Sequence, residues 1–151
     1  MGGFYLKRTG ELVLGIIGII SSALMSLVGI MFIWANQSDE VKSVLDEGIA
    51  AEDPNWESNP GDLNMVMEAL ASYGWAVVIA SIIGIVLGLI GVISIKGNKK
   101  PKLAGWMFII GALLTGIISI GFGFIPALLY LIAGIMAFAR KAPPEPEPPA
   151  Y

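Results

Sequence analysis

Two residue types on which much protein chemistry depends are missing from this sequence: it contains no cysteine and no histidine. The lack of cysteine excludes disulfides, thiolate metal sites and cysteine-linked lipid anchors. The lack of histidine removes the side chain that proteins use most often to shuttle protons or to bind metals. We therefore expect no enzyme activity, no catalytic residue, no cofactor and no metal site.

Charged residues are also scarce, because Asp, Glu, Lys and Arg make up 14% of the chain, against about 25% in an average soluble domain. They are absent from four long stretches, and hydrophobic residues make up 56% of the chain. A helix needs about 20 apolar residues to cross a bilayer, with a lower limit of about 17. The first two stretches exceed that need and the last two lie near the limit. The stretches are residues 12–35, 69–95, 103–120 and 122–139.

These stretches predict an all-α integral membrane protein, a bundle of four transmembrane helices with a short extracellular helical loop between helices 1 and 2. A single helix over 103–139 would be about 55 Å long, so the chain must turn back within it. Gly121, Gly123 and Pro126 predict that hairpin turn. The first stretch is too long for the core of a cleaved signal peptide and is predicted to remain a span. The predicted spans cover residues 12–35, 72–95, 103–120 and 127–139, the last beginning near 122, with the turn at 121–126.

Basic residues predict the orientation, because loops rich in Lys and Arg are retained in the cytoplasm. Eight of the nine basic residues occupy the amino-terminal arm (1–11), the connection 96–102 and the Pro-rich tail (140–151). They are Lys7, Arg8, Lys96, Lys99, Lys100, Lys102, Arg140 and Lys141. Both termini are therefore predicted to be cytoplasmic, with a solvated tail favoured over one that docks on an SH3-like partner. The interface aromatics agree, with Trp34, Tyr73 and Trp75 predicted at the outer interface and Trp106 at the inner one.

The connection between the first two spans, residues 36–71, is strongly acidic. It holds nine acidic residues against one lysine, hence a net charge of −8, which predicts an extracellular loop. Its apolar residues recur at helical spacing and predict a short amphipathic helix over residues 39–51. They are Val41, Val44, Leu45 and Ile49. Asp62 is predicted to cap a helix that continues into the second span. So short a loop cannot build its own core, and we expect it to rest on the helix ends or on the lipid surface.

Small residues form a seam along each predicted span. In lipid, helices gain little from burying apolar side chains against one another, so they associate by close packing at small residues. Steps of three, four and seven keep each seam on one helix face. The seams are Gly15, Gly18, Ser22 and Gly29 in the first span, Ser81, Gly84, Gly88 and Gly91 in the second, Gly111, Thr115 and Ser119 in the third, and Ala133 and Ala137 in the fourth.

Two interpretations of these seams stay open: packing among the four helices, favoured for the first two spans, and oligomerisation or docking on a larger membrane partner. The third-span face is the better partner candidate, because a four-helix bundle need not use every small face. In the second span, Gly88 is predicted to let the facing helix approach closely near Ser22.

Ionisable residues are absent from the predicted spans, which argues against a proton-coupled transporter or an ion path. Glu11 is predicted at the inner boundary within reach of water, where Lys7 and Arg8 can pair with it. The acidic loop could bind Ca²⁺ through its carboxylates. It lacks EF-hand spacing, however, and acidic external loops are common, so a solvated loop is the favoured interpretation.

The two ends of the hydrophobic region resemble a known family. Residues 7–18 (KRTGELVLGIIG) and 131–141 (LIAGIMAFARK) are similar to the DUF4064 family, small four-helix membrane proteins of Gram-positive bacteria. The similarity extends over residues 7–141, and the loop and tail are its least distinctive parts. The resemblance implies a bacterial cell membrane and an accessory or interaction role. It implies no catalytic or binding residues.

The leading functional hypothesis is a non-enzymatic accessory or interaction subunit of a larger membrane assembly, such as a transporter or secretion complex. Its surroundings would be the lipid bilayer and its partner a larger membrane protein, and no nucleic-acid partner is expected. The alternative is a self-assembling homo-oligomeric pore or a lipid-organising membrane protein.

Overall fold

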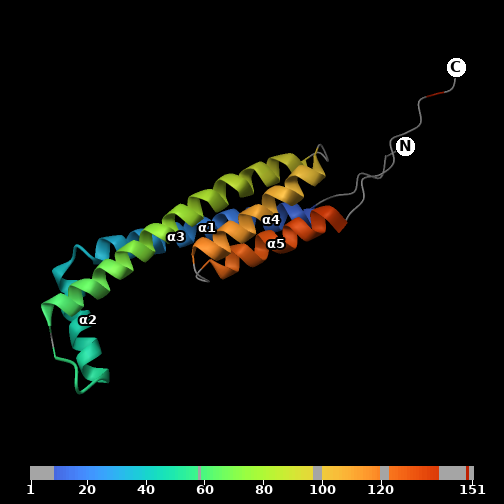
Figure 1. The fold of residues 1–151 in the computed structure, drawn as a ribbon. Helices are drawn as coiled ribbons and strands as arrows, with labels where there is room; N and C mark the ends of the chain where they lie inside the picture. Colours follow the sequence, from blue (N-terminus) through green and yellow to red (C-terminus); the bar gives the residue numbers. More distant parts are fainter. Residues whose placement is uncertain (1–8, 58, 97–99, 120–122, 140–148, 150–151) are drawn as a thin grey trace.

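The computed structural model describes residues 9–57, 59–96, 100–119, 123–139 and 149. These residues form five α-helices (Figure 1). The helices are α1 (Thr9–Ala35), α2 (Asp39–Glu52), α3 (Pro60–Ile95), α4 (Pro101–Ile118) and α5 (Phe124–Ala139). The all-α prediction is therefore confirmed.

Three of these helices, α1, α3 and α4, are long and apolar enough to cross a membrane, and α5 is a shorter apolar helix. At 1.5 Å per residue, the 18 residues of α4 span about 27 Å and the 16 residues of α5 about 24 Å. The outward faces of these helices carry large apolar side chains such as Leu27, Ile93 and Ile117, the last 71% exposed. Helices that are apolar on their exposed faces as well as their buried ones are typical of membrane proteins, so the chain is a membrane protein.

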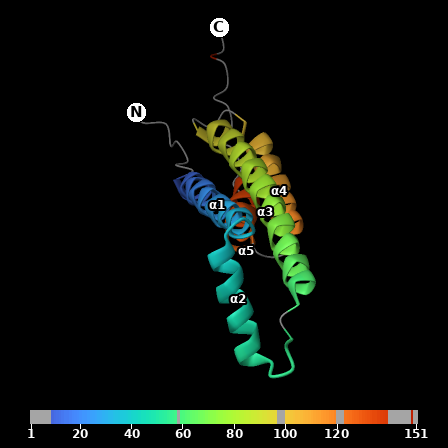
Figure 2. The same cartoon turned by 90° about the vertical axis from the view of Figure 1, so that its left-hand side faces the viewer.

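The four apolar helices pack in a ring, with α1 and α4 each packed against both α3 and α5. α3 and α5 lie across the diagonal, and their backbones approach each other at few points. Figures 1 and 2 show these helices side by side, with α2 projecting from one end. We call α4, α5 and the parts of α1 and α3 beside them the four-helix bundle.

Helix α3 is the longest, with 36 residues, and it extends past the turn between α4 and α5. The Tyr73 hydroxyl donates a hydrogen bond to the Ser119 carbonyl, at 2.6 Å, and so marks the level of that turn on α3. Residues before Tyr73 on α3 therefore lie beyond the bundle, together with α2. We call residues 36–72 the acidic projection.

The residues that begin α3 and α5 differ from the sequence prediction. Asn59, not Asp62, is the N-cap of α3, and its side chain accepts a hydrogen bond from the Gly61 amide. The reason is Pro60, whose fixed φ and missing N–H suit the first helical position. Pro126 lies inside the first turn of α5 rather than in the hairpin, again because the first turn tolerates proline. The predicted helix 39–51 is confirmed as α2, which runs one residue further.

Candidate interaction surfaces

The ring of Tyr130, on α5, fills the centre of the bundle and is fully buried. Glycines of two other helices enclose it. A Cβ atom on Gly18 of α1 would lie 2.6 Å from the ring carbon Cε1, and one on Gly88 of α3 would lie 2.6 Å from the hydroxyl oxygen. A Cβ on Gly84 would lie 3.6 Å from Cε2. These glycines therefore make room for an aromatic ring.

Phe108, on α4, occupies a second gap of the same kind nearer the α3–α4 connection. A Cβ on Gly15 of α1 would lie 2.8 Å from its Cζ atom, and one on Gly91 of α3 would lie 2.6 Å from Cε1. The Phe108 and Tyr130 rings stack, with centroids 6.1 Å apart and an interplanar angle of 16°. Through these two rings, α4 and α5 pack into the glycine seams of α1 and α3.

Direct backbone contact between helices occurs at two other places. Gly29 of α1 faces Gly74 of α3, where a Cβ on either would lie within 2.8 Å of the other's carbonyl oxygen. Gly134 of α5 faces the Gly105 carbonyl of α4, 3.1 Å from the position of an added Cβ. Small residues of this kind allow helix backbones to approach closely in lipid.

Hydroxyl groups meet beside the Tyr130 ring. The Ser22 and Tyr130 hydroxyls are 3.3 Å apart and hydrogen-bond, linking α1 to α5. An added Cβ on Gly84 would lie 3.1 Å from Ser22 Oγ and 2.9 Å from Thr115 Oγ1. Four helices thus bring small or polar groups to one point of the core.

All eleven predicted interface residues in the first three spans are buried inside the bundle. The expectation that the third-span face stays open to a partner is therefore wrong. Gly111, Thr115 and Ser119 face inward because they share a helix face with Phe108, which α1 and α3 enclose. Gly88 faces α1 as predicted, since a Cβ on it would lie 2.8 Å from Ile19, and it also lies against the Tyr130 hydroxyl, which is hydrogen-bonded to Ser22.

Glu11, at the start of α1, is completely buried, not at a water-accessible boundary as expected. It lies four residues before Gly15 on the same seam, so the rotation that buries the seam also buries this carboxylate. The predicted pairing with Lys7 and Arg8 lies outside the described residues.

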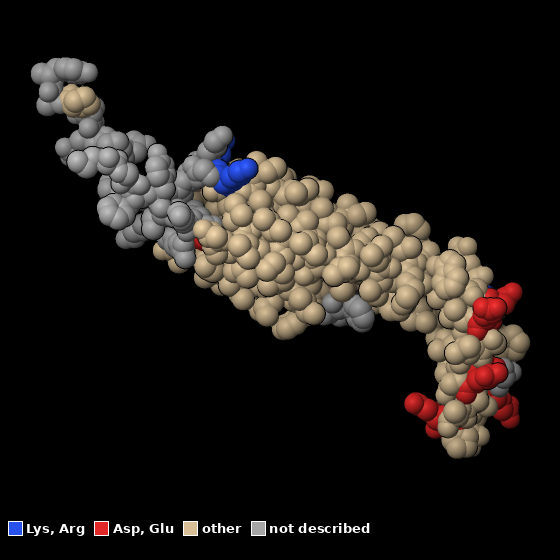
Figure 3. Space-filling view, turned by 180° about the vertical axis from the view of Figure 1, so that it is seen from behind, with Lys and Arg blue, Asp and Glu red and all other residues tan. Residues whose placement is uncertain are grey.

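The predicted topology residues that the structure describes lie together at one end of the bundle. Lys96, Lys100 and Lys102 are exposed around the α3–α4 connection, and Figure 3 shows basic side chains there and most acidic ones at the opposite end. Lys7, Arg8, Lys99, Arg140 and Lys141 lie outside the described residues. Trp34, Trp75 and Trp106 are 60%, 57% and 58% exposed, and Trp106 packs edge-on against Phe138 at 5.8 Å.

Within the acidic projection, α2 is the described helix with the fewest tertiary contacts. α2 touches α3 only slightly, and it has no buried residue. Its end is held by the Trp56 indole, which donates a hydrogen bond to Asp46 at 2.9 Å. In the described part of the chain, no three acidic side chains lie close enough together to form a metal site. The exposed helix α2, with five acidic residues against one lysine, is the candidate interaction surface.

Comparison with known proteins gives one result. The family model described as a protein of unknown function, DUF4064, matches residues 7–118. The chain belongs to the DUF4064 family. No curated protein and no solved structure matches it significantly.

The DUF4064 match begins at Lys7, where the resemblance begins, and ends with the last residue of α4. The closing residues 131–141, which also carried the resemblance, lie beyond the match. The matched part contains α1, α2, α3 and α4, and therefore both the glycine seams and the acidic projection. Tyr130, the ring that fills the seams, comes from the unmatched helix α5.

Proposed function

We propose that this chain is a non-enzymatic accessory subunit of a larger membrane assembly, such as a transporter or secretion complex, and that it binds its partner through α2, the exposed helix of the acidic projection. The supporting observation is a contrast in exposure. The small-residue seams are enclosed in the bundle, whereas Asp39, Glu40 and Glu47 are exposed on an ordered helix that stands clear of it. The partner surface is accordingly basic.

The proposal includes four spans, with α5 as the fourth, and both termini in the cytoplasm. Lysines at one end of the bundle and a loop of net charge −8 at the other support this orientation through the positive-inside tendency. At about 24 Å, α5 is long enough to cross with slight thinning of the bilayer.

Orientation can be measured directly because the chain contains no cysteine. We expect a Glu57→Cys variant to react with a membrane-impermeant thiol reagent on intact cells, and a Lys99→Cys variant to react only after the cells are opened. Labelling of Lys99→Cys but not Glu57→Cys on intact cells would invert the assignment.

The accessory role is tested by purification from the native membrane in mild detergent. We expect a membrane protein to co-purify in a fixed ratio with the parent and to be lost from a Glu40→Gln/Glu47→Gln variant. Glu57→Gln, which removes an exposed charge from the loop after α2, serves as the matched control and should retain the partner. A parent chain that purifies alone and monodisperse would contradict the proposal. Conductance in bilayers that contain only this protein would favour the rival, a homo-oligomeric pore formed between copies.

A further inference from the structure

Helix α2 is amphipathic, and its two faces lie on opposite sides of the helix. At 100° per residue, one side carries the apolar residues and the other carries most of the acidic ones. The apolar side comprises Val41, Val44, Leu45, Gly48 and Ile49, and the acidic side comprises Asp39, Glu40, Asp46 and Glu47. Val44 is 68% exposed, whereas Val41, Leu45 and Ile49 are partly buried, so the chain itself covers this apolar face only in part.

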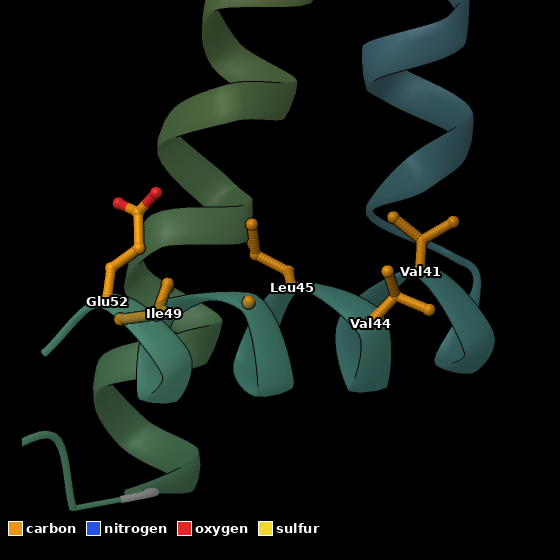
Figure 4. Close-up of a pocket in the computed structure, with 6 residues that line it drawn as sticks. Val41, Val44, Leu45, Ile49 and Glu52 are labelled. Carbon is orange, nitrogen blue, oxygen red and sulfur yellow. The ribbon is translucent and has the colours of Figure 1, made fainter. Parts of the chain in front are cut away.

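The apolar side lines a shallow, open groove of about 410 Å³ whose wall is formed by α2 alone. The lining residues are Val41, Val44, Leu45, Gly48, Ile49 and Glu52. Figure 4 shows the labelled side chains on the side of α2 toward which α1 and the later turns of α3 extend. The apolar face of α2 is therefore turned toward the membrane-crossing helices.

Two hydrogen-bonded turns hold the start of α2 against the end of α1. The Gln37 amide donates to the Trp34 carbonyl at 2.9 Å, and the Ser38 amide donates to the Ala35 carbonyl at 3.2 Å. The Ser38 hydroxyl then accepts from the Val41 amide as the N-cap of α2. α2 thus begins five residues after Trp34, an exposed aromatic of the kind that sits at the membrane–water interface.

From that point α2 runs across the direction of the bundle rather than along it (Figures 1 and 2). If the bundle crosses a bilayer, a helix in this position lies close to the plane of the membrane surface. Its apolar face then continues the exposed apolar surface of α1, which reaches Met31 and Trp34 at the same end. Lipid already covers that surface in any membrane-embedded form of the chain.

We infer that α2 is an interfacial helix whose apolar face rests on the lipid surface at the acidic end of the bundle. Helices of this type bury their apolar face about 5–10 Å into the boundary between headgroups and acyl chains. Covalent attachment to α1 keeps α2 at high effective concentration beside the membrane, so modest apolar burial suffices to hold it there. In this position the acidic face points away from the membrane, where the proposed basic partner can reach it.

The charge of α2 determines which lipids it prefers. Interfacial helices commonly carry Lys and Arg that attract anionic lipids. α2 has one lysine, Lys42, against five acidic residues, and Glu52 lies at the end of the apolar side. Anionic headgroups therefore repel it, and we expect it to lie on zwitterionic headgroups.

Site-directed spin labelling of the cysteine-free chain tests this placement. Single variants Val41→Cys and Leu45→Cys place a nitroxide on the apolar face, and Ser43→Cys and Glu47→Cys place one on the acidic face. Each labelled protein is inserted as one copy per phosphatidylcholine nanodisc. Its accessibility is then measured to oxygen, which concentrates in lipid, and to a water-soluble nickel chelate. We expect the nitroxide to be severalfold more accessible to oxygen than to the nickel chelate at positions 41 and 45. At positions 43 and 47 we expect the reverse. In phosphatidylglycerol nanodiscs this contrast should shrink.

Three results would overturn the inference. Equal access of nickel to all four positions would place the apolar face in water. Protection of 41 and 45 from both reagents would mean that protein covers the face. An equal contrast in both lipids would overturn the headgroup preference. The nanodisc contains no partner, so these outcomes are independent of whether co-purification supports the proposed function.

Discussion

Glycine has opposite surroundings in the four-helix bundle and in the acidic projection. In the four-helix bundle, a Cβ atom on Gly88 would lie 2.6 Å from the Tyr130 hydroxyl and 2.8 Å from Ile19. In the acidic projection, a Cβ on Gly48 of α2 would meet nothing within 4 Å. The bundle is thus specified by what surrounds each position, whereas α2 is specified by its caps and by its own pattern. Substitutions should consequently be costly in the bundle and nearly neutral at exposed positions of α2.

The largest loss of stability is expected from removing the Tyr130 ring, which fills the space between the glycine seams. Tyr130→Ala leaves a void lined by glycines, which have no side chains to move into it. Replacing a buried aromatic residue by alanine typically costs about 3–5 kcal/mol, and we expect the lower part of that range because lipid, not water, surrounds the bundle. Thermal unfolding in one detergent measures the loss. Phe124→Ala, on the same helix but 63% exposed, is the control and should unfold close to the parent.

A smaller but still clear effect is expected for overpacking. Gly88→Leu places a side chain where Tyr130 and Ile19 already lie, and overpacking a filled core typically costs about 1–3 kcal/mol. The matched control is Gly48→Leu, which has open space around it. Melting of both variants in the same detergent decides the comparison. If Gly88→Leu melts with the parent, the rings do not occupy the seam as described.

The smallest effect should be that of the Ser22–Tyr130 hydrogen bond. Interhelical hydrogen bonds in membranes average about 0.6 kcal/mol, and this one, at 3.3 Å, is long. Tyr130→Phe keeps the ring and removes only the hydroxyl, so a slight lowering of the melting temperature is expected. A double-mutant cycle with Ser22→Ala isolates the pair. A cost for Tyr130→Phe as large as that for Tyr130→Ala would mean that the hydroxyl, not the ring, organises the core.

Some of what sequence reasoning missed was within its reach. Gly74 lies one heptad before Ser81 and therefore extends the seam of the second span, where it meets Gly29. Phe108 lies three residues before Gly111, and Tyr130 three before Ala133, so each ring shares a face with small residues. A large ring on a small-residue face is the signal that the seams on neighbouring helices accommodate it. The contact between Gly105 and Gly134 gave no comparable signal, because neither glycine was part of a predicted seam.

The sequence by itself determined where the apolar helices lie, that they belong in a membrane, and that residues 39–51 form an acidic helix. Each of these follows from properties that are local or additive. A long stretch without charge must satisfy its backbone within one helix in lipid, and the period of Val41, Val44, Leu45 and Ile49 is a property of one segment. Which helix faces which, and what fills the space beside a glycine, only the tertiary structure decided. A glycine has no side chain whose chemistry would indicate what packs against it. The same seam therefore suits an approaching backbone, as at Gly29 and Gly74, or an aromatic ring, as at Gly88. The burial of Glu11 could not be predicted from the sequence either, because it depends on how α1 is rotated against the other helices.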